Sequence, residues 1–211
     1  PIKSSAASDV YKRQYASRFI LEHPYCGLIL DMGLGKTVIT LTALFALALD
    51  YFTAGKILVI APKRVAEDTW PKELKKWEHL IGMKASLVVG TKKQREQALA
   101  EAADVYIINR ENVVWLVENH RWDFSTVVID ELSSFKSSKA QRFKALKHVR
   151  PKVSRVIGLT GTPSPNGLLD LWPQMYLLDM GQRLGRYMGG YRERFFLPCL
   201  LYTSDAADDL I

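Results

Sequence analysis

The chain has 211 residues, of which 48% are hydrophobic and 24% are charged. That balance excludes a disordered chain and fits a globular protein long enough for one α/β domain with a sizeable core. The two cysteines, Cys26 and Cys199, lie far apart, so we expect neither disulfides nor a cysteine-based metal cluster. The longest apolar run, Val38 to Leu49, is too short to cross a bilayer, and no signal peptide opens the chain. We therefore expect a cytoplasmic protein with no membrane partner.

The formal net charge is +7 at pH 7. An excess of Lys and Arg favours a polyanionic partner such as nucleic acid, because each phosphate contact releases counterions. The alternative is a set of lysines that only keep the surface hydrated. The basic residues are spread along the chain rather than gathered in one run.

Both ends of the sequence differ in character from the rest. Residues 1–14 lack apolar periodicity, and residues 199–211 are acidic in an otherwise basic chain. Both ends resemble translated sequencing-adapter read-through, so we expect artefactual tails there; ordinary disordered termini are the alternative. This interpretation leaves residues 15–198 as a single domain.

Apolar runs with the period of a strand alternate with runs with the period of a helix along that domain. An alternation of this kind predicts βαβ units with right-handed crossovers. The run Lys56 to Ala61 is continuously apolar after its first residue, which is typical of a strand covered on both faces. We therefore expect an α/β fold with a central, mostly parallel sheet flanked by helices on both faces. The expected strands are 26–31, 56–61, 85–89, 105–108, 126–129 and 155–159, and the expected helices are 15–22, 36–51, 69–77, 92–103, 111–118, 139–148 and 167–178, the last interrupted near Pro173.

The segment Asp31-Met32-Gly33-Leu34-Gly35-Lys36-Thr37 lies between an expected strand and an expected helix. Strand, glycine-containing turn, Lys-Thr and helix are the parts of a phosphate-binding loop. Glycines let the backbone curl so that successive N–H groups face phosphate oxygens, and the helix N-terminus adds positive potential. The lysine supplies a full charge for the phosphates, and the threonine hydroxyl supplies an oxygen for Mg²⁺. The residues expected to bind the nucleotide are Gly33, Leu34, Gly35, Lys36, Thr37 and Val38.

This loop departs from the usual pattern at one position, where Leu30 replaces the first glycine. The alternative interpretation is a tight strand-to-helix turn with a solvated lysine.

A second set of chemical residues follows the apolar strand 126–129. Asp130 and Glu131 come directly after it, so they are expected at the carboxyl edge of the sheet, where α/β proteins bind ligands. The phosphate-binding loop leaves its own strand at the same edge. Asp130 is expected to hold Mg²⁺ together with Thr37, and Glu131 to orient or deprotonate the attacking water. A pair of acids that caps a helix is the alternative.

A third motif, Leu159-Thr160-Gly161-Thr162-Pro163, also follows an apolar strand. Its hydroxyls are expected at the same edge, where they can sense whether phosphate is bound. An ordinary turn is the alternative, because Thr, Gly and Pro are all common in turns.

In this order, the three motifs resemble those of superfamily-two helicases, and specifically of the Swi/Snf-type DNA-dependent ATPases. The Asp-Glu pair followed by Leu-Ser-Ser-Phe-Lys is similar to the phage and bacterial branch. The resemblance covers residues 15 to 198 and implies the first RecA-like lobe of such a protein, a P-loop NTPase domain. Further residues that carry it are Ile60-Ala61-Pro62, Trp70, Glu73 and Asn166.

The resemblance implies ATP and Mg²⁺ as cofactors, double-stranded DNA as partner, and roles for individual residues. Lys36, Asp130 and Glu131 would be catalytic, and Thr160, Gly161 and Thr162 would couple hydrolysis to the grip on DNA. The residues implied to lie on the nucleic-acid backbone are Pro62, Lys63, Arg64, Asn109 and Arg110. Trp115, Trp122 and Trp172 are instead expected in the core.

Three features depart from the family pattern. Leu132 and Ser133 follow the acid pair where the family has a small residue and a histidine. The glutamine that reads adenine is expected near position 13, which is Arg13, with Gln14 next to it. The second helicase lobe, which supplies arginines to the γ-phosphate, is expected to be absent from this chain.

The expected function is therefore that of the ATP-binding lobe of an ATP-dependent DNA helicase or translocase, with little turnover by the lone lobe. Two other functions stay open on the sequence. One is a nucleotide-binding module without turnover, and the other is a phage DNA-packaging ATPase.

Overall fold

The computed structural model describes residues 2–52, 54–164 and 166–196, with side chains described from Val10 onward. Its centre is a six-stranded sheet with the order β1-β6-β5-β2-β4-β3, and every pair of neighbouring strands is parallel. This confirms the expected α/β class. The strands are β1 (Tyr25–Ile29), β2 (Lys56–Ala61), β3 (Ala85–Val88), β4 (Val105–Asn109), β5 (Phe124–Asp130) and β6 (Arg155–Thr160).

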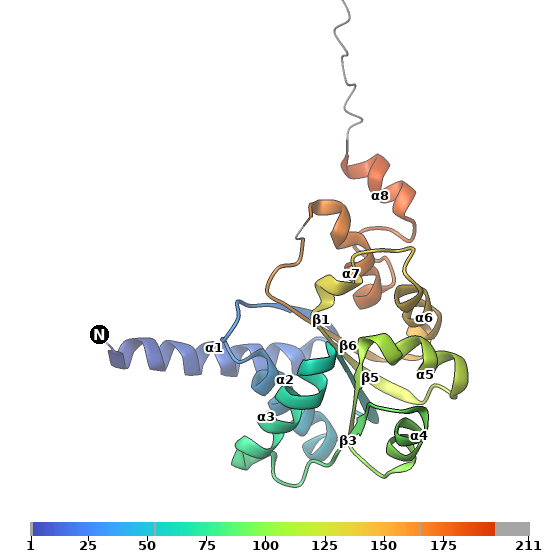
Figure 1. The fold of residues 1–211 in the computed structure, drawn as a ribbon. Coiled ribbons are helices and arrows are strands. Elements are labelled where there is room, and N and C mark those ends of the chain that lie inside the picture. The colour runs from blue at the N-terminus through green and yellow to red at the C-terminus, as the bar shows by residue number, and fades with distance from the viewer. Residues whose placement is uncertain (1, 53, 165, 197–211) are drawn as a thin grey trace, which may run out of the picture.

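Helices cover both faces of the sheet (Figure 1). Alternate residues of a central strand point to opposite faces, so Ile57 and Val59 of β2 pack under one layer while Leu58 and Ile60 pack under the other. The first layer is made by α1 (Ile2–Glu22), α2 (Lys36–Phe45) and α3 (Trp70–Lys76). The second is made by α4 (Lys92–Ala100), α5 (Val113–Asn119), α6 (Gln141–Val149) and α7 (Leu171–Asp179). Helix α8 (Met188–Phe195) lies beyond α7, away from the sheet (Figure 1), and its Tyr191 hydroxyl donates a hydrogen bond to the carbonyl oxygen of Leu168. Within the described ranges, no helix is long and apolar enough to cross a membrane.

Helix α1 is longer than the sequence indicates. The expected helix 15–22 is the carboxyl-terminal part of a helix that begins at Ile2. That part packs against the sheet layer through Ala16 and Ile20, whereas the Val10 and Tyr11 side chains before it are exposed. Figure 1 shows the amino-terminal half extending away from the body of the protein. The opposite tail, 199–211, lies outside the described residues.

The other expected helices are also present with shifted ends, and two of them differ in a way that has a physical reason. The expected helix 36–51 is regular as far as Phe45 and then continues as a π-helical turn, Ala46–Asp50. Pro173 does not interrupt α7, because it is the third residue of that helix. A proline in the first turn leaves no helical hydrogen bond unmade.

The three tryptophans expected in the core lie there. Trp122 and Trp172 are 8% and 3% exposed, and Trp115 packs partly buried against the same cluster. This confirms that they are structural residues rather than stacking platforms.

Candidate nucleotide site at the carboxyl edge of the sheet

The loop between β1 and α2 has the backbone shape that a phosphate cradle needs. Gly33 and Gly35 have φ angles of 82° and 79°, in the left-handed region where a side chain would be strained. The space that a Cβ of Gly33 would occupy is open. Because α2 begins directly after Gly35, the free N–H groups of its first turn face this loop.

Lys36 lies folded over the same loop. Its Nζ donates hydrogen bonds to the carbonyl oxygens of Leu30, at 2.7 Å, and Asp31, at 2.9 Å. The ammonium is thereby held at the mouth of the cradle, and Thr37 stands next to it in the first turn of α2, half-buried. Backbone N–H groups, an ammonium and a hydroxyl together suit a phosphate chain with its bound Mg²⁺.

Strand β5 delivers Asp130 to this site in a buried position. The residue is 9% exposed, its Oδ2 accepts a 2.9 Å bond from the indole Nε1 of Trp70, and its Oδ1 accepts a 3.0 Å bond from the Glu131 amide. Burial raises the pKa of Asp130 above its ordinary value, although both hydrogen bonds and the positive charge of Lys36 oppose that rise. In the sheet, β1 ends opposite Thr160 of β6 and Asp130 of β5 lies opposite Leu159 of β6, so the phosphate-binding loop and this carboxylate leave the sheet at the same edge.

Glu131 has a different environment from its neighbour. Its backbone is left-handed, with φ 54° and ψ 56°, which is unusual for a residue with a side chain. Its side chain is 53% exposed, and Oε2 lies 3.9 Å from Nη1 of Arg110. The two acids of the motif therefore divide into one buried carboxylate held by two hydrogen bonds and one exposed carboxylate with a long ion pair to Arg110.

The third motif lies next to the phosphate-binding loop. Thr160, at the end of β6, is opposite Ile29 in the parallel register, and its carbonyl oxygen accepts a 3.1 Å bond from the amide of Leu30. Its hydroxyl accepts a 3.2 Å bond from the amide of Thr162. A shift in the phosphate-binding loop would therefore reach this segment directly.

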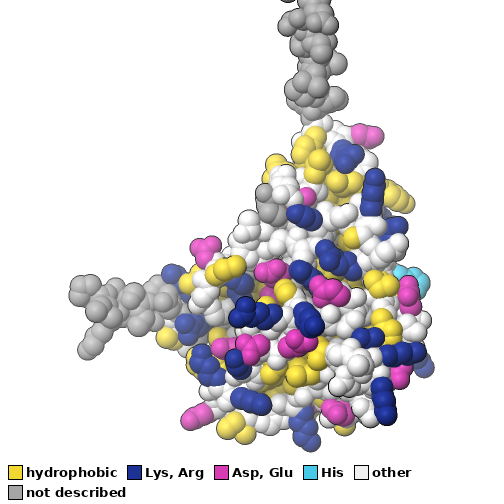
Figure 2. All heavy atoms as spheres, viewed as in Figure 1, with side chains coloured by type: hydrophobic (Ala, Val, Ile, Leu, Met, Phe, Trp, Pro, Cys, Tyr) yellow, Lys and Arg dark blue, Asp and Glu magenta, His cyan; other side chains and the backbone are white. Residues whose placement is uncertain are grey.

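The residues expected on nucleic acid follow β2 and β4. Lys63 and Arg64 are exposed at the start of the segment after β2, with Pro62 half-buried before them. Asn109 is only 7% exposed, and its amide group is used within the loop after β4, so its side chain does not face outward. Figure 2 shows the basic side chains interspersed with acidic ones on the visible face rather than in one continuous patch.

Leu132, one of the departures from the family pattern, has a structural explanation. Its side chain is 4% exposed and packs on β6 at Gly158. A Cβ at position 158 would lie 2.6 Å from Cδ2 of Leu132, a distance that real contacts do not reach. Glycine in the neighbouring strand therefore makes room for the larger residue after the acid pair.

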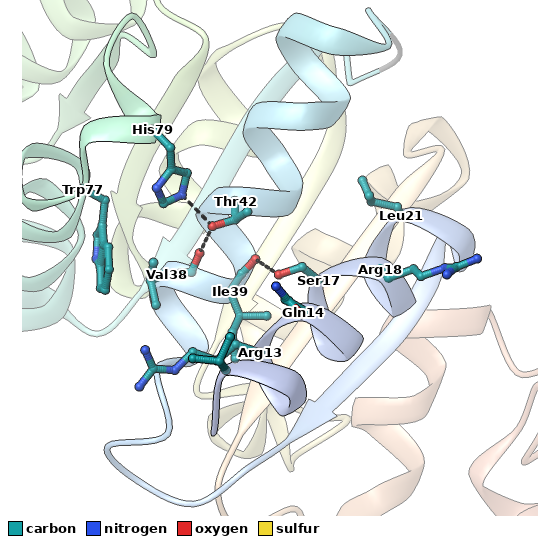
Figure 3. A pocket seen from close by; sticks show the side chains of 11 residues that line it. Arg13, Gln14, Ser17, Arg18, Leu21, Val38, Ile39, Thr42, Trp77 and His79 are labelled. Atoms are coloured by element: carbon teal, nitrogen blue, oxygen red, sulfur yellow. Dashed lines mark hydrogen bonds between the residues drawn. The ribbon is translucent and has the colours of Figure 1, made fainter. Parts of the chain in front are cut away.

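A cavity of about 510 Å³ lies beside the phosphate-binding loop, between α1, α2 and the segment after α3 (Figure 3). Trp77 and Val38 line one side and Gln14 the other. His79 and Thr42 close part of the wall through a 2.8 Å bond between Nε2 and Oγ1. The cavity reaches the loop at Arg13, whose Nε lies 3.5 Å from where a Cβ of Gly35 would be.

Sequence reasoning missed three features of this site: the Trp70–Asp130 bond, the Arg110–Glu131 pair and the cavity. The first had a signal, since a buried tryptophan needs an acceptor for its N–H and the carboxyl edge offers one. The other two depend on how loops and helices lie in space and carry no pattern of spacing.

No group of three or more His, Cys, Asp or Glu residues that could hold a metal ion occurs in the part of the chain that the structure describes. Mg²⁺ does not require such a group, because it usually binds one or two protein oxygens, phosphate oxygens and water. Thr37 and Asp130 each carry a side-chain oxygen of the kind that such a site uses.

The family profile described as "SNF2-related domain" matches residues 17–186. Protein p41 of Acyrthosiphon pisum secondary endosymbiont phage 1 is 44% identical over 173 residues, which cover 78% of this chain and 38% of that protein. Helicase SWR1 of Cryptococcus neoformans var. neoformans serotype D (strain B-3501A) is 34% identical over 163 residues, which cover 74% of this chain and 13% of the helicase. The chain thus spans well under half the length of these relatives.

Two solved structures share the fold. The Sulfolobus solfataricus SWI2/SNF2 ATPase core in complex with dsDNA aligns with a TM-score of 0.74 at 24% identity, over 89% of this chain and 38% of that one. The Sulfolobus solfataricus SWI2/SNF2 ATPase core domain aligns with a TM-score of 0.65 at 27% identity, over 89% of this chain and 37% of that one. With its motifs in family order, its strands in one parallel sheet and most of its length matched, the chain belongs to the SNF2-related domain family.

Proposed function

We propose that this chain is the ATP-binding lobe of a DNA-dependent ATPase that moves on double-stranded DNA. The observation that carries the proposal is that the phosphate-binding loop with Lys36, which follows β1, and the acid pair at the end of β5 lie at one edge of the sheet, on either side of β6. Family membership and the fold shared with an ATPase core in complex with dsDNA support it.

Asp130 and Glu131 are proposed to have different roles because their environments differ. The buried carboxylate of Asp130, with its rotamer held by two hydrogen bonds, suits a fixed oxygen that shares Mg²⁺ with Thr37. The exposed carboxylate of Glu131 suits a base that turns toward an attacking water. Mg²⁺, when bound, neutralises charge on the phosphates. Gly33, Leu34, Gly35, Lys36, Thr37 and Val38 form the phosphate cradle in this proposal.

The nucleic-acid contacts are proposed for the exposed basic residues at the same edge. Lys63, Arg64 and Arg110 supply the charge for phosphate contacts, and Asn109 shapes the loop that presents Arg110. The segment Thr160 to Thr162 is proposed to couple the two sites, because its strand lies against the phosphate-binding loop.

For the chain by itself, we propose nucleotide binding with turnover near background. It covers 38% of the aligned Sulfolobus core, and phosphoryl transfer in such motors needs arginines from a second lobe. In this proposal the segment binds nucleotide without appreciable turnover, and motion on DNA belongs to a longer protein that contains it.

Two substitutions test the proposal in that longer protein. Lys36→Ala should abolish DNA-stimulated ATP hydrolysis by weakening phosphate binding, and Glu131→Gln should leave ATP binding intact while hydrolysis stops. ATP affinity is measured with a fluorescent nucleotide, and hydrolysis by release of inorganic phosphate with and without duplex DNA. Lys152→Gln, an exposed change at the opposite edge of the sheet, is the control and should alter neither. Normal hydrolysis by the Glu131→Gln protein would remove the role assigned to that acid.

A further inference from the structure

Arg110 is held between two carboxylates that belong to different loops. Its Nε lies 2.9 Å from Oε1 of Glu111, the next residue in the chain. Its Nη1 lies 3.9 Å from Oε2 of Glu131, which follows β5, so this contact spans the end of β2 between β4 and β5. The Arg110 side chain is 27% exposed, so it faces both the protein and the solvent.

The contact with Glu111 is part of the loop's own architecture. Oε2 of Glu111 accepts a 3.0 Å bond from the side-chain Nδ2 of Asn109, and the side-chain Nδ2 of Asn112 donates a 2.5 Å bond to Oδ1 of Asn109. Burial acts to raise the pKa of Glu111, but the hydrogen bonds from Arg110 and Asn109 outweigh it and the pKa is lowered, so this carboxylate stays charged. The loop therefore fixes where the guanidinium points.

The contact with Glu131 is looser and can be exchanged. Its 3.9 Å separation is that of an ion pair rather than of a short hydrogen bond, and the Glu131 side chain is 53% exposed. A guanidinium has five N–H donors, and only two of its nitrogens face these carboxylates. A phosphate that approaches from solvent can thus take over Nη1, because planar, two-pronged binding of phosphate is what arginine does best.

We propose that Arg110 is a positioning residue for Glu131 that also senses nucleic acid. Without nucleic acid it holds the Glu131 carboxylate toward the loop after β4, and a DNA phosphate that binds the guanidinium releases the carboxylate to act as a base. The proposal rests on the proposed function and adds to it a physical link between the DNA contact and hydrolysis. That link runs through a single side chain and requires no movement of the sheet.

Linkage gives this proposal a test that does not depend on hydrolysis. If Glu131 and a DNA phosphate compete for Arg110, removal of the Glu131 charge must tighten DNA binding, and it must do so only while Arg110 is present. The Glu131–Arg110 contact is an exposed ion pair, and the free energy of such a pair is equivalent to about a two- to fivefold change in DNA affinity.

The first experiment is a double-mutant cycle on the 211-residue chain. The dissociation constant for a fluorescein-labelled duplex is measured by anisotropy at low salt for the wild type, Glu131→Gln, Arg110→Gln and the double variant. We expect Glu131→Gln to tighten binding about two- to fivefold in the wild type and not in the Arg110→Gln background. The matched control is Glu67→Gln, which removes an exposed acid from the segment after β2 and should act equally in both backgrounds. An equal effect of Glu131→Gln in both backgrounds would overturn the proposal.

The second experiment measures hydrolysis in a longer protein that contains this lobe. We expect Arg110→Gln to raise the ATPase rate without DNA several-fold and to reduce the stimulation by DNA, with ATP affinity unchanged as a check on folding. A DNA-free rate that stays the same or falls would overturn the proposal, since Arg110 would then not be restraining Glu131. Failure of the proposed function has a different signature, because the wild type itself would then show neither duplex binding nor ATP hydrolysis.

Discussion

The indole Nε1 of Trp70 lies 2.9 Å from Oδ2 of Asp130, and this bond joins the helix layer on one face of the sheet to the end of β5. Trp70 is fully buried, so its N–H has no access to water, and the carboxylate is its partner. The consequence is that the rotamer of the proposed Mg²⁺-binding carboxylate is set by a residue 60 positions earlier in the chain.

The first prediction concerns that bond. Trp70→Phe removes the donor and leaves a buried carboxylate oxygen unpaired, which should lower the free energy of unfolding by about 1–3 kcal/mol. It should also weaken Mg²⁺-dependent ATP binding, because Asp130 loses its fixed orientation. Urea unfolding and nucleotide titrations with and without Mg²⁺ measure the two effects. Trp122→Phe is a matched control, since it also removes a buried indole bond, 2.8 Å to the carbonyl oxygen of Phe124, but far from the loop. If both variants bind MgATP like the wild type, the orienting role of Trp70 is wrong.

The second prediction concerns pH. The pKa of Asp130 is raised by burial in the folded state, so as pH rises the unfolded chain releases this proton first. The contribution of Asp130 to the free energy of unfolding is therefore greatest below the ordinary aspartate pKa of about 4, where the carboxyl is protonated in both states. It is lost as pH rises through the pKa of Asp130 in the folded protein. The difference in unfolding free energy between the wild type and Asp130→Asn should shift against the wild type between acidic and neutral pH. Urea unfolding at several pH values gives this difference directly, and a difference that stays constant or moves in favour of the wild type would contradict the prediction.

The third prediction concerns the packing of Leu132 on β6. Gly158→Ala places a methyl group 2.6 Å from Cδ2 of Leu132 and 3.1 Å from Cδ2 of Leu178, so it should destabilise the protein by about 1–3 kcal/mol. Leu132→Ala alone should also destabilise it, because a buried side chain is lost. Combined, the two changes should cost less than the sum of their separate effects, since the shorter side chain makes room for the new methyl group. Strict additivity in urea unfolding would show that the two residues do not share this space.

The fourth prediction concerns the cavity beside the phosphate-binding loop. If the base of the nucleotide lies there, the ring of Trp77 offers it an aromatic face. Trp77→Ala should then weaken ATP binding about three- to tenfold and leave the binding of inorganic triphosphate unchanged, because triphosphate has no base. Competition titrations with both ligands measure the ratio. An equal loss of affinity for ATP and for triphosphate would show that Trp77→Ala disturbs the phosphate-binding loop and not the binding of the base.

The sequence predicted the fold well because its signals are local. Continuous apolar runs such as Lys56 to Ala61 identify buried parallel strands, and all six expected strands are present with end shifts of at most two residues. Parallel strands end at one edge, so the shared edge of the phosphate-binding loop and Asp130 followed from topology alone. The helix ends were less predictable, because the turn after Phe45 and the start of α1 depend on packing rather than on spacing.

The finer parts of the site depend on contacts between distant segments. The amino-acid sequence around Arg110 does not indicate that its guanidinium faces Glu131, because a basic residue after a strand is equally consistent with a solvated surface. The same holds for Asn109, which was expected on nucleic acid but is buried within its own loop. Sequence motifs therefore identify the loops that contain functional residues, whereas the contacts of each side chain become known only from the folded structure.

The strand order has a practical consequence for handling the protein. Within the described residues β1 is the outermost strand on its side, with β6 as its one neighbour, and the Ile29 side chain on it is 60% exposed. An outermost strand of a sheet can pair with a strand of another molecule, so we expect concentrated samples of this segment to associate through β1. Replacement of Ile29 by lysine, a charge of the sort that natural outermost strands use against such association, is the simplest route to material that stays in solution.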